Sequence, residues 1–187
     1  MSAPVRQATI ADLYQHDGKA ELIDGRIVEL MATGMGPHEI ASNIYVTLRE
    51  YAKTVGGGRG YNDNMGFTVA RLPSGRESFS PDAAFHRGPF PANRYRFISG
   101  APVFAVEVRS ENDYGPAAER ELAEKREDYF QAGTLIVWDV DMDPETVTAY
   151  RRHQPPVVFR RGQVADAEPV IPGWRITVED VFAEGGM

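Results

Sequence analysis

The chain has 187 residues, of which 42% are hydrophobic and 25% charged, a composition typical of a globular protein with an apolar core. It contains no cysteine, which excludes disulfides, thiol catalysis and cysteine-ligated metals, so a metal ion would need oxygen or imidazole ligands. Its net charge of -7 argues against a protein that coats nucleic acid non-specifically, but an enzyme that meets DNA at one cleft can carry such a charge.

The sequence shows no apolar run that could cross a bilayer, and its N-terminus lacks the apolar centre of a secretory signal. We therefore expect a cytoplasmic protein with no membrane partner. It also shows no internal repeat and no linker, which predicts a single domain over residues 1–187.

The N-terminal third is predicted to form a short helix, a hairpin and a long helix. Thr9 is placed as a helix N-cap, and the Asp24-Gly25 pair divides residues 20–31 into the two strands of a hairpin. Pro37 suits the first turn of a helix over residues 37–53, because apolar side chains recur there every three or four residues. These side chains are Ile40, Ile44, Leu48 and Tyr51.

Glycines punctuate residues 56–60 and predict a flexible turn, since the run lacks the Gly-Lys-Ser/Thr ending of a phosphate-binding loop. Residues 66–72 and 76–86 are then predicted to be strands connected by a turn at residues 73–75. A loop rich in Pro, Gly and Arg is expected over residues 87–102.

Residues 103–108 are almost wholly apolar and predict a central strand that is covered on both faces. A helix over residues 115–132 leads to a second buried strand over residues 134–140. This order predicts that the two strands are parallel neighbours joined by a right-handed crossover. Edge hairpins are expected over residues 145–166, and a short closing helix at Thr177.

Glu107 is the most informative residue, because it is the single charge within the strand sequence VFAVEV. Burial of an unpaired carboxylate costs on the order of several kcal/mol, so a partner or a cation must hold this charge. One interpretation is an ion pair with Arg109, which lies two residues on and therefore on the same face of the strand. The other is a metal site.

Asp82 and Lys125 are candidate site residues chiefly because they could lie close to Glu107. Asp82 follows Pro81 at a strand entrance, where an acid by itself would indicate only a turn. Lys125 interrupts the apolar stripe of the helix over residues 115–132. Its ammonium group either points at the carboxylates on the preceding strand or crosses the core to reach water.

Several other motifs carry no comparable signal. The sequence has neither the HExxH pair of zinc proteases nor the G-x-S-x-G motif of serine hydrolases. Asp139, Asp141 and Asp143 alternate at a strand end but lack the glycine and closing glutamate of a calcium loop, so we expect them to be solvated.

Five segments in order, AELIDGRIVEL, PHEIASNIYVTL, SPDAAF, FAVEVRS and EKREDYFQAGTLIVWDVD, resemble the PD-(D/E)XK nuclease superfamily and, within it, the Uma-two family of restriction endonuclease-like proteins. The resemblance implies an α/β (α+β) fold with a restriction endonuclease-like mixed central β-sheet flanked by helices. It also implies that Asp82 and Glu107 are acidic metal ligands.

The resemblance implies further site residues. The superfamily pattern has lysine two residues after the second acid, a position that Arg109 occupies here; arginine cannot act as a base but can clamp a phosphate. In the Uma-two family the lysine is moved to the following helix, which implies Lys125. Glu21 and His38 match further polar positions of the family pattern, which implies that they line the same cleft. The alternative is that Glu21 is an exposed hairpin carboxylate and that His38 is a surface residue at the start of a helix.

The function that the resemblance implies is hydrolysis of phosphodiester bonds of DNA by a metal-dependent endonuclease. Asp82, Glu107 and the carbonyl of Val108 would hold Mg²⁺ or Mn²⁺, while Lys125 orients the nucleophile and stabilises the transition state. The alternative is a catalytically silent nuclease-fold module that binds nucleic acid or a protein partner, and hydrolysis of another phosphate ester is also open. A homodimer would suit cleavage of two strands.

Overall fold

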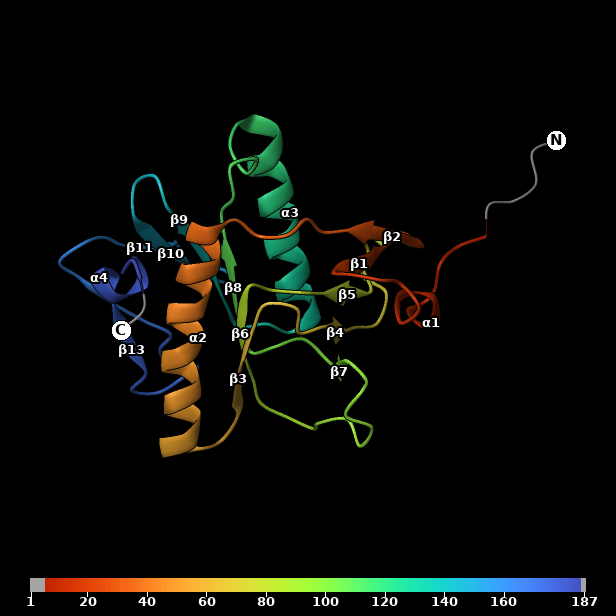
Figure 1. The fold of residues 1–187 in the computed structure, drawn as a ribbon, viewed down its shortest axis with the longest axis horizontal. Coiled ribbons are helices and arrows are strands. Elements are labelled where there is room, and N and C mark those ends of the chain that lie inside the picture. Colours follow the sequence, from red (N-terminus) through yellow and green to blue (C-terminus); the bar gives the residue numbers. More distant parts are fainter. Residues whose placement is uncertain (1–5, 186–187) are drawn as a thin grey trace.

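A computed structural model of the chain describes residues 6–185, which form a mixed central sheet with helices on both faces (Figure 1). The sheet order is β11-β10-β9-β8-β6-β3, in which β8 and β9 are parallel and the other neighbours antiparallel. This arrangement confirms the predicted fold class. The strands of the central sheet are β3 (Arg59–Asn62), β6 (Ala83–His86), β8 (Phe104–Val108), β9 (Ile136–Asp141), β10 (Thr146–Arg151) and β11 (Val157–Phe159).

Three smaller sheets and two short helices surround this sheet. A hairpin of β1 and β2 and a three-stranded sheet of order β5-β4-β7 lie on the α3 side of the molecule (Figure 1). Among the described residues, no helix is long and apolar enough to cross a membrane. The bounds are α1 (Ile10–Leu13), β1 (Ala20–Ile23), β2 (Arg26–Glu29), β4 (Phe67–Thr68), β5 (Ser78–Phe79), β7 (Ile98–Ser99), β12 (Val164–Asp166), β13 (Arg175–Thr177) and α4 (Val178–Val181).

The long helix α2 (Met35–Val55) covers one face of the central sheet. Its residues Ile40, Ile44 and Leu48 are buried at the spacing that the sequence predicted, and they pack with Phe85 of β6 in one apolar cluster. The cluster continues to the C-terminal segment, where the Trp174 ring lies with its centroid 5.2 Å from that of Trp138 in β9 and 5.6 Å from that of Phe104 in β8. This face is therefore sealed by apolar side chains.

The second long helix, α3 (Pro116–Ala132), covers the opposite face. Pro116 lies in its first turn, and Gly133 ends it in the left-handed conformation, with a φ of 105°. The helix joins β8 to β9, which confirms the predicted parallel pair. Along β8 successive side chains alternate between faces, so Val106 packs on the α2 side while Ala105 and Glu107 face α3. The alternation directs the one carboxylate of the strand toward Lys125.

Some sequence-based boundaries were wrong. The predicted strand over residues 66–72 is paired only at Phe67–Thr68, and that over residues 76–86 divides at Pro81 into two strands that belong to different sheets. The glycine turn leads directly into β3, where a Cβ on Gly60 would lie 3.1 Å from the Leu48 Cβ and from the Arg49 amide nitrogen of α2. A larger residue there would crowd α2, because the strand approaches the helix closely, a cause that no local pattern reveals.

The packing of α2 yields a stability prediction. Leu48 is fully buried, whereas Val46 on the same helix is 52% exposed. Leu48→Ala should lower the free energy of unfolding by about 2–5 kcal/mol, because it leaves a cavity in a close-packed core. Val46→Ala, the matched control, should change it by less than about 0.5 kcal/mol. Urea unfolding followed by circular dichroism measures both, and equal losses would contradict the assigned packing.

Candidate active site

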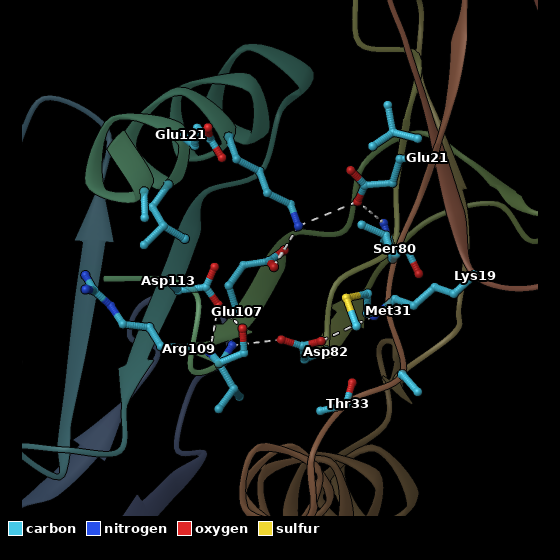
Figure 2. Close-up of a pocket in the computed structure, with 18 of the residues that line it drawn as sticks. Lys19, Glu21, Met31, Thr33, Ser80, Asp82, Glu107, Arg109, Asp113 and Glu121 are labelled. Atoms are coloured by element: carbon cyan, nitrogen blue, oxygen red, sulfur yellow. Dashed lines mark hydrogen bonds and ion pairs between the residues drawn. The ribbon is translucent and has the colours of Figure 1, made fainter. Parts of the chain in front are cut away.

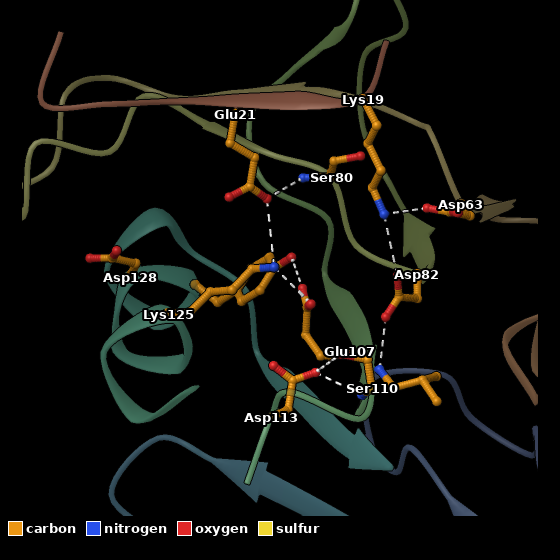
Figure 3. A network of polar contacts seen from close by, with 12 residues as sticks. Lys19, Glu21, Asp63, Ser80, Asp82, Glu107, Ser110, Asp113, Lys125 and Asp128 are labelled. Carbon is orange, nitrogen blue, oxygen red and sulfur yellow. Dashed lines mark hydrogen bonds and ion pairs between the residues drawn. The ribbon is translucent and has the colours of Figure 1, made fainter. Parts of the chain in front are cut away.

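Asp82 lies where the chain enters β6, next to the C-terminal half of β8. Its backbone N–H donates to the carbonyl oxygen of Val106 at 3.0 Å, which fixes its place beside the strand. Its side chain turns back to β8, because Oδ2 accepts the N–H of Val108 at 2.8 Å. The other oxygen, Oδ1, lies 3.3 Å from the Lys19 ammonium (Figure 3). One carboxylate oxygen is thus tied to the backbone and the other faces a cation.

Glu107 is held by two side chains of α3. Its Oε2 accepts from Lys125 Nζ at 2.7 Å, and its Oε1 accepts from the Tyr129 hydroxyl at 2.6 Å. Lys125 and Tyr129 are four residues apart and therefore project from the same face of the helix. The Lys125 side chain is only 19% exposed, so it ends at the carboxylate rather than in bulk water.

Glu21 approaches the same lysine from β1. Its Oε1 lies 3.6 Å from Lys125 Nζ and accepts the backbone N–H of Ser80 at 2.9 Å, and its Oε2 pairs with Arg76. Arg76 in turn donates from Nε to Asp128 of α3 at 2.9 Å. Glu21 is 2% exposed, so the interpretation of an exposed hairpin carboxylate is wrong.

Glu21, Asp82, Glu107 and Lys125 border one cavity of about 380 Å³ (Figure 2). Of the residues that the sequence singled out, six line it: Glu21, Asp82, Glu107, Val108, Arg109 and Lys125. They come from β1, the entrance of β6, the end of β8 and the middle of α3, so segments distant in sequence meet at one place. His38 is not brought to this cavity; it lies exposed in the first turns of α2, as the alternative interpretation expected.

Arg109 pairs with carboxylates other than Glu107. Its Nε and Nη2 each lie 2.8 Å from an Asp139 oxygen, and it also pairs with Glu119 of α3. The predicted Glu107–Arg109 pair is therefore replaced by Glu107–Lys125. Asp139 is 5% exposed, so the expectation that it is solvated was wrong. Its carboxylate is buried because the Arg109 guanidinium group pairs with both of its oxygens.

Sequence reasoning missed several residues of this polar network, among them Tyr129, Lys19, Asp63, Arg76 and Asp128. Tyr129 was read as part of an apolar stripe, and its hydroxyl gives no sequence signal. Lys19 precedes the hairpin, and its ammonium group pairs with both Asp82 and Asp63 (Figure 3). No local motif could have predicted this contact, because residues 19, 63 and 82 belong to separate segments.

Burial and the neighbouring charges shift the pKa values of Glu107 and Lys125 in this cluster. Burial raises the pKa of Glu107 to about 7; the Lys125 ammonium acts in the opposite direction, and the charges of Asp82 and Glu21 add to the rise. Burial alone would lower the pKa of Lys125, but Glu107 and Glu21 raise it above its ordinary value. Lys125 is therefore a cation at neutral pH.

The side chains of the cavity supply only some of the ligands that a hard divalent cation needs. Among residues 6–185, no group of three or more His, Cys, Asp and Glu side chains lies close enough to hold a metal ion. Mg²⁺, however, is commonly bound by one or two carboxylates and keeps several waters. Asp82 and Glu107 supply two carboxylates to one cavity, and the charge of Asp82 adds to the burial that raises the pKa of Glu107.

Comparisons with known proteins agree with this architecture. Residues 8–179 match the model of the Uma2 family, described as "Putative restriction endonuclease". Among solved structures, a crystal structure of "a putative nuclease belonging to DUF820" from Anabaena variabilis ATCC 29413 matches with a TM-score of 0.72 and 20% sequence identity, covering 93% of this chain and 97% of that chain. This likeness shows a shared fold. The comparison with curated proteins found no match.

The raised pKa of Glu107 predicts a pH-dependent stability. An acid whose pKa is about 7 in the folded state and 4.5 otherwise contributes stability below pH 4.5 that is lost as the pH rises through 7. From about pH 5 to pH 8, the free energy of unfolding of the wild type should fall relative to that of Glu107→Gln by about 1–3 kcal/mol. Urea unfolding in EDTA measures this, and parallel pH profiles of the two proteins would refute the assigned environment.

Proposed function

Because the chain belongs to the Uma2 family of restriction endonuclease-like proteins, we propose that it hydrolyses phosphodiester bonds of DNA with the aid of a divalent cation. One observation carries the proposal: Asp82, Glu107 and Lys125 border a single cavity, and the Lys125 ammonium lies 2.7 Å from Glu107. Two acids and a lysine in one cleft suit metal-assisted phosphodiester hydrolysis, because carboxylates bind the ion and an ammonium group stabilises developing negative charge.

Asp82 and Glu107, together with the main-chain carbonyl of Val108, are the groups that would hold Mg²⁺ or Mn²⁺. When bound, such an ion lowers the pKa of a coordinated water and offsets the charge that develops on the phosphate. The hydrogen bond from the Val108 N–H to Asp82 Oδ2 presets one of these carboxylates, and the Tyr129 hydroxyl presets the other. A ligand that is already oriented loses less conformational entropy on binding.

Lys125 adds a positive charge from the protein to that of the metal ion. Because its pKa is raised, it stays protonated and serves as a hydrogen-bond donor that orients the attacking water and stabilises the pentavalent phosphate, rather than as a base. Lys125 contacts Glu107 itself, whereas Arg109 pairs with Asp139 and Glu119, which favours Lys125 over Arg109 for this role. Arg109 then fixes the end of β8 against α3.

A catalytically silent module that binds nucleic acid or a protein partner is the competing function. The chain keeps both acids and the lysine at the border of one cavity, whereas a decayed site would be expected to have lost one of them. Cleavage of both strands of a duplex would require two such clefts, which a homodimer provides. Binding of DNA without cleavage in the assay below would favour the silent module.

The test is cleavage of supercoiled plasmid and of single-stranded DNA in Mg²⁺ or Mn²⁺. Asp82→Asn, Glu107→Gln and Lys125→Ala should each lower the cleavage rate by about 100-fold or more, because each removes a group that binds the cation or the developing charge. Addition of EDTA should abolish cleavage. Rates are measured by gel electrophoresis of time courses.

The controls are Glu124→Gln, an exposed acid on α3 one residue from Lys125, and Lys53→Ala, an exposed lysine of α2. Both should cut at the wild-type rate. Equal rates in the wild type and all three site variants would show that the cleavage comes from a contaminant or from other residues, and the proposal would be withdrawn.

A further inference from the structure

The segment between β6 and β7 has a composition unlike the rest of the chain. Residues 87–97 contain Arg87, Arg94 and Arg96 and no acidic residue, although the whole chain has a net charge of -7. Aromatic residues alternate with these arginines at Phe90, Tyr95 and Phe97. All three arginines are exposed. Such interleaving of guanidinium groups and rings suits phosphates and bases respectively.

Tyr95 is the most exposed large apolar side chain of the described residues, at 94%. It lines a second cavity of about 390 Å³ together with Tyr14, His16, Phe97 and Lys19. That volume lies within the range of pockets that hold small molecules. A ring that is exposed at the edge of a cavity gains apolar burial when a flat partner stacks on it.

The wall of this second cavity is held in place by contacts of its own. The Phe97 N–H donates to the Tyr14 hydroxyl at 3.0 Å, and the centroids of the two rings are 4.7 Å apart. The Arg96 guanidinium lies over the Tyr14 ring, 4.4 Å from its centroid. Gly66 leaves room for the Phe97 ring, since a Cβ there would lie 2.6 Å from its Cδ1. The aromatic wall is therefore preorganised.

The second cavity adjoins the carboxylate cavity. Lys19 and Ser80 line both of them. The Lys19 ammonium lies 3.3 Å from Asp82 Oδ1 and also pairs with Asp63, so it stands between the reaction site and the aromatic wall. A strand whose scissile phosphate lies at Asp82 and Glu107 would place a neighbouring nucleotide at Tyr95.

We infer that the basic-aromatic loop over residues 87–97 and the cavity beneath Tyr95 bind a nucleotide of an unpaired DNA strand next to the scissile phosphate. The inference rests on the proposed function and deepens it by naming single-stranded DNA as the preferred substrate. In a duplex each base is covered by its neighbours, so Tyr95 can stack only on a base that has left the helix. Arg94 and Arg96 supply the charge that attracts the flanking phosphates.

The test is binding of a fluorescently labelled single strand of about 15 nucleotides, followed by anisotropy in EDTA so that no cleavage occurs. Tyr95→Ala should weaken binding by about tenfold or more, because a stacked base is lost, whereas Tyr95→Phe should retain most of the affinity. Arg94→Gln should weaken binding and reduce its dependence on salt. A duplex of the same sequence should bind more weakly than the single strand.

Two exposed residues outside the loop serve as matched controls. Leu135→Ala removes an exposed apolar side chain and Arg152→Gln an exposed arginine, and both should bind as the wild type does. Wild-type affinity in Tyr95→Ala, or equal binding of duplex and single strand, would overturn the inference even if the wild type cleaves DNA. Loss of affinity in Tyr95→Ala by a protein that never cleaves would support the inference and reject the proposed function.

Discussion

The burial of the Glu107 carboxylate is the constraint on which the site depends. The alternation of β8 turns this residue to the face that α3 covers, where water cannot solvate its charge fully, and burial raises its pKa to about 7. Lys125 and Tyr129 compensate from one face of the helix, so the position of α3 against β8 is itself part of the site. Helix α3, the crossover that connects β8 to β9, therefore also supplies the two side chains that stabilise the buried Glu107 carboxylate.

Further ion pairs surround this contact and connect α3, the N-terminal hairpin and the central sheet. Arg76 joins Glu21 of the N-terminal hairpin to Asp128 of α3, and Arg109 joins the end of β8 to Asp139 of β9. Loss of one partner in such a buried pair leaves an uncompensated charge, which is more damaging than loss of an exposed pair. The geometry of the cavity therefore follows from contacts between segments rather than from any one loop.

The sequence revealed those parts of the site whose cause is local. Glu107 stood out because it interrupts an apolar strand, and Lys125 because it interrupts an apolar helical stripe; the parallel strand pair followed from the order of elements. The burial of Glu21 was left open, since it depends on Arg76, which lies 55 residues further along the chain. The short strands β3, β7 and β13 escaped as well, because their pairing is set by partners distant in sequence and not by their own composition.

The charge balance of the cavity explains why a phosphate would need help to enter it. Four cations line it, Lys19, Arg76, Arg109 and Lys125, and each already contacts at least one carboxylate. The acids that line it, Glu21, Asp82, Glu107, Asp113 and Glu121, outnumber them by one. A phosphodiester brought into this cluster meets cations that are already paired with carboxylates, so attraction must come from a bound divalent ion or from arginines outside the cavity. The basic-aromatic loop, which borders the second cavity that shares Lys19 with this one, is a source of such charge within the chain.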